Sequence, residues 1–104
     1  MFDVIENEKL YSDKKLNVTG MTTYYCMLGK DYTILEYEIE LVLDKHIMEF
    51  DTFGHWINHF GDYRGTREKA MLEIYNTVDE KLKPKSIRVT SKNLNRHPTY
   101  ELEY

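Results

Sequence analysis

The sequence predicts an α+β fold with two layers, a β-sheet on one side and two helices on the other. Three observations indicate this fold. One segment alternates apolar with acidic side chains, which is the period of a strand with one buried face. Two later segments repeat apolar residues every three to four positions, which is the period of a helix that packs on one face. Alternation returns after Pro84, so the predicted order is two strands, two helices and two strands (ββααββ).

The two strands of the first half follow a short lead-in. Residues 1–15 show no clear period, so we expect one domain at residues 16–104. Residues 16–26 are rich in Thr, Tyr and Val and favour a strand, and residues 28–31 favour a turn. The next strand is the clearest in the chain, because two kinds of side chain alternate along it. Its apolar face consists of Leu35, Tyr37, Ile39, Leu41 and Leu43, and its other face carries Glu36, Glu38 and Glu40.

The middle of the chain predicts two helices. A short one has its apolar face at Phe53, Trp56, Ile57 and Phe60. A longer one extends from about residue 66 to residue 83, and it ends before Pro84 because proline disfavours helical geometry in the residue before it. The apolar stripe of the longer helix consists of Met71, Ile74, Tyr75, Val78 and Leu82.

Two further strands are expected near the end of the chain. Ile87 and Val89 alternate with polar residues, residues 93–98 favour a turn, and alternation resumes over residues 100–104. Each pair of neighbouring strands is expected to form a hairpin. We therefore predict a four-stranded antiparallel sheet with both helices on one face.

Composition and charge exclude several classes of protein. A chain of 104 residues suits one domain, and 14 basic against 18 acidic residues give a net charge of −4, which argues against a protein that mainly binds nucleic acid. No apolar run reaches the roughly 20 residues that span a bilayer, and the N-terminus does not match a signal peptide. The single cysteine, Cys26, excludes an internal disulfide and suits a reducing compartment. We therefore expect a cytoplasmic protein that does not contact membranes.

Three residues that can react or accept hydrogen bonds have a spacing that is typical of one protein family. Cys26 and Glu49 are 23 residues apart, and Glu49 and Glu68 are 19 apart. In this register, and from Cys26 to about residue 98, the chain resembles the 7-cyano-7-deazaguanine (nitrile) reductases, which have the tunnelling fold (T-fold). The flanking matches are Trp56, Ile57, Asn58, Phe60, Pro84, Ile87, Val89 and Arg96. The resemblance implies a homo-oligomer whose sheets join into a barrel, with sites between subunits.

The resemblance also implies roles for these residues. Cys26 would attack the nitrile carbon of a deazapurine to form a covalent thioimide, since a thiolate is a strong nucleophile. Glu49 and Glu68 would accept hydrogen bonds from the base, because an ionised carboxylate is an acceptor only. Each residue also has an ordinary structural interpretation. Cys26 suits a small buried apolar position, Glu49 a solvated loop, and Glu68 the first turn of a helix.

The acid that donates a proton in this family has no counterpart in the matching register. The position seven residues after Cys26 is Thr33, and Asp31 lies nearby but out of register. Either Asp31 or Thr33 is a candidate to handle the proton, although a hydroxyl is a weak donor at neutral pH. An ordinary turn acid and a strand threonine are the structural alternatives.

The residues that the family uses for its nicotinamide cofactor are also replaced. Asp51 and Gly54 occupy the positions of two lysines, and Arg67 occupies that of a histidine. Arg67 and Arg96 are candidates to contact the substrate, a phosphate or a ribose. We therefore predict no cofactor firmly: NADPH remains an option, but its lysine motif is absent. No metal is predicted, because His55 and His59 have no evident third ligand.

Three functions remain open from the sequence. The first is an enzyme that acts on the nitrile of 7-cyano-7-deazaguanine, either by reduction, as in queuosine synthesis, or by ammonia addition to an amidine, as in reductase-like archaeosine synthases. The second is a non-catalytic protein that holds a purine-like ligand or another protein. The third is a T-fold activity on pterins or GTP, which usually needs zinc. The substrate base is expected to be free or carried in tRNA or DNA.

Overall fold

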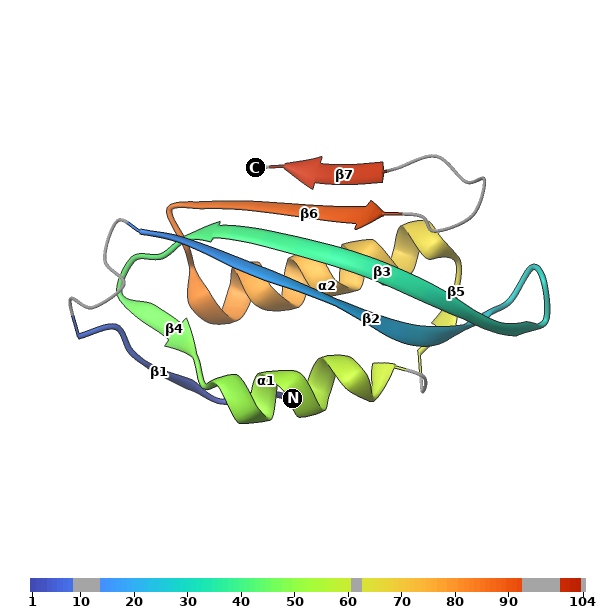
Figure 1. Ribbon diagram of the computed structural model, residues 1–104, viewed down its shortest axis with the longest axis horizontal. Helices are drawn as coiled ribbons and strands as arrows, with labels where there is room; N and C mark the ends of the chain where they lie inside the picture. Colours follow the sequence, from blue (N-terminus) through green and yellow to red (C-terminus); the bar gives the residue numbers. More distant parts are fainter. Residues whose placement is uncertain (9–13, 61–62, 93–99, 104) are drawn as a thin grey trace.

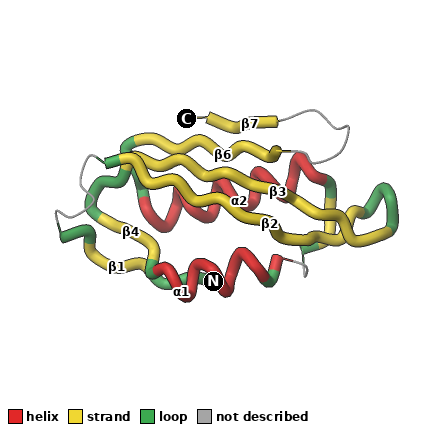
Figure 2. Tube along the Cα trace, viewed as in Figure 1, coloured by secondary structure: helices red, strands yellow, loops and turns green. Residues whose placement is uncertain are grey.

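The computed structural model describes residues 1–8, 14–60, 63–92 and 100–103. It contains seven strands and two helices among them, arranged as a twisted sheet with helices beneath it (Figures 1 and 2). The elements are β1 (Val4–Glu6), β2 (Lys15–Cys26), β3 (Asp31–Val42), β4 (His46–Met48), α1 (Phe50–Asn58), β5 (Arg64–Gly65), α2 (Arg67–Leu82), β6 (Ser86–Lys92) and β7 (Tyr100–Glu103). The predicted α+β class is confirmed.

The main sheet differs from the prediction in its number of strands. The four predicted strands are present as β2, β3, β6 and β7, in antiparallel register. A fifth strand, β5, pairs with the end of β2 in parallel, so the order is β5-β2-β3-β6-β7. The predicted four-stranded sheet with ββααββ order is therefore wrong in detail. A strand of two residues is too short to show a period, which is why β5 could not be predicted.

A second, two-stranded sheet connects the start of the chain to the core. β1 pairs antiparallel with β4, although no strand was predicted in the first 15 residues. Phe2 is fully buried, and its ring centroid lies 5.0 Å from that of Phe53 and 5.1 Å from that of Trp56. Burial of an aromatic ring of this size is worth about 1.5–3 kcal/mol. Phe2 thus packs against the middle of α1.

Both helices pack on the same face of the main sheet. The buried positions of β3 are its odd-numbered residues from Leu35 to Leu41, as the alternation predicted. They form one apolar cluster with buried residues of α1 and α2. In Figure 1 α2 passes behind the sheet, while α1 lies beyond β2. The other face of the sheet carries the glutamates and is open to solvent.

The helix ends are defined by their caps. Glu49 is the N-cap of α1, and its side chain accepts hydrogen bonds from two backbone N–H groups of the first turn. Thr66 is the N-cap of α2, and its hydroxyl accepts from the N–H of Lys69. Lys83 is the C-cap of α2 and has the left-handed conformation with φ of 47°. Pro84 follows, in agreement with the predicted end. The turn predicted at residues 93–98 lies outside the described residues.

Candidate functional site

Cys26 lines a surface cavity of about 380 Å³ at the junction of β2, β3 and the start of α2. This cavity, the Cys26 cavity, is lined by Tyr24, Cys26, Leu28, Thr33, Thr66, Arg67, Glu68 and Tyr100. It therefore gathers four of the side chains that the sequence singled out, namely Cys26, Thr33, Arg67 and Glu68. They come from three segments that are separated in the chain.

Strand register explains why β2 and β3 supply the floor of the cavity. Tyr24 and Cys26 are two residues apart on β2, so their side chains point to the same, helix-covered face of the sheet. Thr33 is the direct cross-strand partner of Tyr24. Directly paired residues of an antiparallel ladder have their Cβ atoms about 5 Å apart on one face. The floor is thus fixed by the longest ladder among the residues that the structure describes.

The short strand β5 brings the start of α2 to the same place. The backbone N–H of Tyr25 donates to the carbonyl of Tyr63, and the N–H of Met27 donates to the carbonyl of Gly65, both at 2.9 Å. Gly65 is consequently the ladder partner of Cys26. Since α2 starts two residues later, its first turn must lie beside the cysteine.

Arg67 is a half-buried cation beside the phenol ring of Tyr24. Its guanidinium carbon lies 6.0 Å from the ring centroid, and Nη2 donates to the carbonyl of Ile34 over 3.4 Å, which is a long hydrogen bond. Nη1 is buried and has no hydrogen-bond partner among the described residues. An orphaned donor of this kind favours an acceptor from a ligand.

Glu68 is exposed in the first turn of α2 and keeps its charge at neutral pH. Hydrogen bonds from its own backbone N–H and from Thr66 lower the pKa of its carboxyl, and the nearby charge of Arg67 lowers it further. Glu68 is therefore an acceptor. Its position in the first turn also agrees with the structural interpretation. The carboxylate can therefore stabilise the start of the helix and also accept hydrogen bonds from a ligand.

Glu49 does not line the Cys26 cavity of its own chain. One chain alone therefore does not bring Glu49 together with Cys26 and Glu68. Its Oε1 accepts from the N–H of Thr52 at 2.9 Å and its Oε2 accepts from the N–H of Asp51 at 3.0 Å. These bonds lower the pKa of its carboxyl. Glu49 is thus the N-cap of α1 and not a free loop acid. Each carboxylate oxygen retains a lone pair for another donor.

Two other candidates are placed differently. Asp31 is exposed, does not line the cavity, and its Oδ1 accepts from the backbone N–H of Tyr32 at 2.7 Å. It pairs with Cys26 across the ladder but behaves as a turn acid. Arg96 lies outside the described residues. The proton-handling role expected of Asp31 or Thr33 thus has only Thr33 in the cavity.

Sequence reasoning missed two tyrosines of the site. Tyr24 is only 1% exposed and forms the floor, and Tyr100 of β7 forms one wall. The signal for Tyr24 was present, because a residue two positions before a strand cysteine must share its face. Tyr100 also lines a smaller cavity of about 170 Å³ between α2 and β7, which shares Arg67 and Glu68 with the first.

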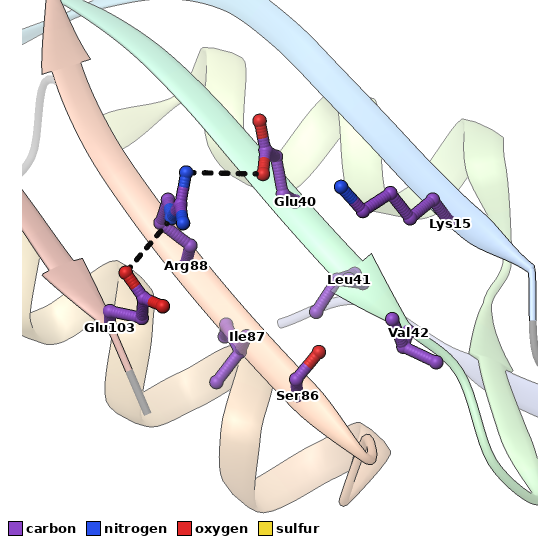
Figure 3. Close-up of a pocket in the computed structure, with 8 residues that line it drawn as sticks. All are labelled: Lys15, Glu40, Leu41, Val42, Ser86, Ile87, Arg88 and Glu103. Carbon is purple, nitrogen blue, oxygen red and sulfur yellow. Dashed lines mark hydrogen bonds and ion pairs between the residues drawn. The ribbon is translucent and has the colours of Figure 1, made fainter.

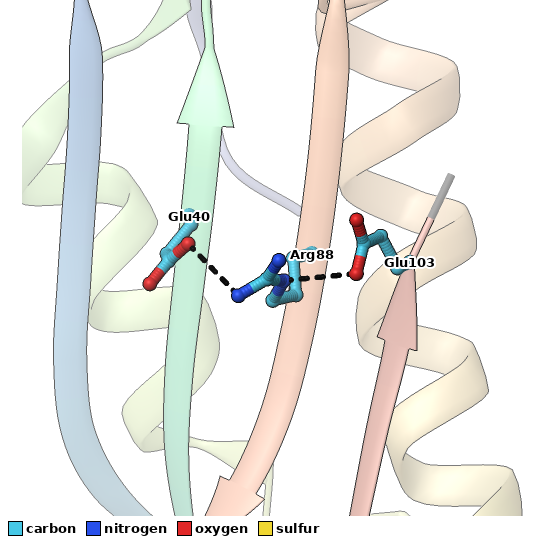
Figure 4. Close-up of polar contacts among 3 residues, drawn as sticks. All are labelled: Glu40, Arg88 and Glu103. Atoms are coloured by element: carbon cyan, nitrogen blue, oxygen red, sulfur yellow. Dashed lines mark hydrogen bonds and ion pairs between the residues drawn. The ribbon is translucent and has the colours of Figure 1, made fainter.

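The opposite face of the sheet has a charged row and a small cavity. Arg88 lies between Glu40 and Glu103: its Nη1 is 3.6 Å from Oε2 of Glu40 and its Nε is 3.1 Å from Oε2 of Glu103 (Figures 3 and 4). The cavity beside it holds about 100 Å³ and includes Lys15 (Figure 3). It is too small for a purine, and no cysteine lines it.

His55 of α1 and the C-cap residue His59 give no sign of a metal centre. The ring centroids of His55 and His59 are 4.2 Å apart, and Nδ1 of His59 is 2.8 Å from the carbonyl oxygen of His55. Among the described residues no three His, Cys, Asp or Glu side chains cluster closely enough to bind a metal. In the same part of the chain, neither helix is long and apolar enough to span a bilayer.

Comparison with known proteins supports the resemblance. No family model matches the chain. Over 51 residues the chain is 39% identical to NADPH-dependent 7-cyano-7-deazaguanine reductases of Campylobacter jejuni, including subspecies doylei and subspecies jejuni strain 81-176. The match covers 49% of this chain and 40% of each relative. The chain therefore aligns with less than half the length of these relatives.

A solved structure has the same fold. The crystal structure of the archaeosine synthase QueF-Like in the apo form superposes with a TM-score of 0.68. The superposition covers 86% of this chain and 90% of that one at 16% sequence identity. Identity this low compares folds only, and it agrees with the predicted α+β architecture. The chain thus resembles the 7-cyano-7-deazaguanine reductases in sequence and the archaeosine synthase in fold.

Proposed function

We propose that the chain is an enzyme of 7-deazaguanine modification that attacks the nitrile of 7-cyano-7-deazaguanine with Cys26. The observation that carries this proposal is the Cys26 cavity, which places a thiol, an ionised carboxylate and an arginine with a spare donor around one space. Its volume of about 380 Å³ is within the usual range of small-molecule sites. The relatives' names supply the substrate class.

The chemistry follows from the groups around the cavity. The sulfur of Cys26 would add to the nitrile carbon to give a thioimide. The carboxylate of Glu68 would accept the ring N–H and exocyclic amine of the base, donors that cost about 1–3 kcal/mol each if buried unpaired. Arg67 would donate from Nη1 to a carbonyl or ring nitrogen of the same ligand.

Ammonia addition to an amidine fits this chain better than reduction. Asp51 and Gly54 stand where the resemblance expects cofactor-binding lysines, and Asp51 is exposed at the start of α1. A carboxylate there would repel the 2′-phosphate of NADPH rather than bind it. The residues present therefore do not fit the cofactor, and we assign no reductive step to the protein.

The position of Glu49 favours a site that is shared between subunits. Since Glu49 is absent from the Cys26 cavity of its own chain, its role in base binding requires a second copy. The sheet has edges suited to such assembly: in the described part of the chain, no strand pairs with the outer edge of β2 from Lys15 to Tyr24. We propose a homo-oligomer in which α1 of one subunit approaches the cavity of the next.

Intact-protein mass spectrometry tests the nitrile chemistry. The native chain and Cys26→Ala are each incubated with 7-cyano-7-deazaguanine. We expect a mass gain of one ligand in the native chain alone, and ammonia rather than NADPH should then remove the adduct. Absence of an adduct in a folded native chain would refute thioimide formation with the free base.

The alternative is a binding protein without catalysis. Thr33 favours it, because a threonine replaces the acid of the resembling enzymes and cannot donate a proton readily. This alternative predicts that the native chain and Cys26→Ala bind the base reversibly with equal affinity, and that neither gains mass. Calorimetric titration alongside the mass measurement separates the two functions.

A further inference from the structure

We infer that the phenol of Tyr24 moves the proton when Cys26 adds to the nitrile, in place of the acid that Thr33 has replaced. This inference rests on the proposed function and names a further catalytic residue in the same cavity. No role for Tyr24 follows from the resemblance, because the register of Cys26, Glu49 and Glu68 does not include it.

Tyr24 lies next to both groups that matter. It precedes Cys26 by two residues on the same face of β2, and it is the cross-strand partner of Thr33. It lines the cavity together with both, and at 1% exposure it is the floor of that cavity. A ligand held against Cys26 would therefore contact the phenol.

The surroundings of Tyr24 keep its phenol protonated, and they would stabilise a transient negative charge on its oxygen. Burial raises the pKa of Tyr24 above its ordinary value, and the neighbouring Cys26 and Glu68 raise it further. The guanidinium of Arg67 acts in the opposite direction from 6.0 Å above the ring. The phenol is consequently a neutral O–H donor at neutral pH, and Arg67 would stabilise it while it gives up a proton.

The other polar groups of the cavity are less suited to this task. Glu68 is ionised and can only accept, and Arg67 does not release protons in proteins. The hydroxyl of Thr33 is a far weaker acid than a phenol. Asp31 does not line the cavity. Two tyrosines line the cavity; Tyr24 shares a strand face with Cys26, whereas Tyr100 is on β7, three strands away from β2.

A relay through the phenol balances the reaction. The Cys26 sulfur forms a bond to the nitrile carbon as one π bond of the C≡N group breaks. The nitrile nitrogen takes the Tyr24 proton, and the Tyr24 oxygen takes the proton of the thiol. The net change is addition of S–H across C≡N, so Tyr24 ends as it began and no oxidant or reductant is consumed.

The test is single-turnover adduct formation with 7-cyano-7-deazaguanine, followed by intact mass. We compare the native chain, Tyr24→Phe and a matched control, Tyr25→Phe, whose ring lies on the opposite face of β2 against Tyr32. General acid catalysis is worth at least about 100-fold, so Tyr24→Phe should form the adduct about 100-fold more slowly and Tyr25→Phe at the native rate. Reversible affinity, measured in the Cys26→Ala background, should be the same with Tyr24 or Phe.

A second variant distinguishes a proton relay from a merely structural hydroxyl. Thr33→Asp in the Tyr24→Phe chain places a carboxylic acid opposite position 24, and it should recover at least tenfold of the lost rate. Native-like rates in Tyr24→Phe, or loss without rescue by Thr33→Asp, would overturn the relay. No adduct in the native chain would instead refute the proposed function itself, so the two failures are distinguishable.

Discussion

Glu49 caps the N-terminus of α1 and remains a candidate to bind the base. The sequence offered either a base-binding carboxylate or a solvated loop acid, and the structure shows an N-cap. Capping depends on backbone N–H groups that become unpaired only because α1 starts there. Helix boundaries are uncertain by one or two residues from sequence alone, so this contact could not be predicted.

The cap makes stability depend on pH in a defined direction. The pKa of Glu49 is lower in the folded chain than its ordinary value of 4.5, so its ionised form stabilises the fold above that pH. That contribution is lost as the pH falls through the lowered pKa. Glu49→Gln should therefore show a lower Tm at neutral pH and a shallower loss of Tm in acid. Parallel Tm curves from thermal circular dichroism would contradict the cap.

Gly20 is required by close packing rather than by its backbone angles. A Cβ at this position would lie 2.5 Å from the hydroxyl oxygen of Tyr37, its ladder partner. Gly20→Ala should lower the unfolding free energy by about 1–3 kcal/mol, the usual cost of overpacking. Gly54→Ala is the matched control, because nothing lies within 4 Å and a helix gains about 1 kcal/mol from alanine. Urea unfolding measures both.

At the scale of elements, periodicity predicted the long strands and helices, and short elements escaped it. β2 and α2 were expected within about one residue of their observed bounds, whereas the predicted alternation began at Leu35 and β3 begins at Asp31. β1, β4 and β5 have two or three residues each, and their pairing depends on which segments the fold brings together. The same limit applied to the site: the spacing of Cys26 and Glu68 was informative, whereas their contact through β5 was not visible in the sequence.

The C-terminus of α2 stores strain that can be removed. Lys83 has a φ of 47°, where a side chain costs roughly 1–2 kcal/mol and glycine costs little. Lys83→Gly should raise the unfolding free energy by up to about 1 kcal/mol, after the extra chain entropy of glycine is subtracted. Glu80→Gly, within the same helix, should lower it by about 1 kcal/mol. A loss of stability in Lys83→Gly would contradict the role assigned to this cap.

At the scale of the whole molecule, the separation of Glu49 from the Cys26 cavity makes a shared site testable. Cys26→Ala chains retain Glu49, and Glu49→Gln chains retain Cys26. When the two variants are mixed and reassembled, sites that combine the intact residues should form the adduct, always on the Glu49→Gln chain. Intact mass identifies which chain is modified.

Two results would contradict the shared site. The first is adduct formation by pure Glu49→Gln chains with native affinity for the base. The second is sedimentation at micromolar concentration that shows only a 12.5 kDa species. Wild-type chains are the reference for these assemblies.

The β5 ladder also bears on local motion at the Cys26 cavity. The amides of Tyr25 and Met27 are bonded to Tyr63 and Gly65, and they hold the start of α2 against Cys26. Breaking these two hydrogen bonds would separate Cys26 from Glu68. The core under β3 would stay folded, because local openings cost less free energy than global unfolding. The hydrogen-exchange rates of these two amides therefore report whether the site is assembled. Their hydrogen exchange should be faster than that of central β2 amides, and it should slow when a base occupies the cavity.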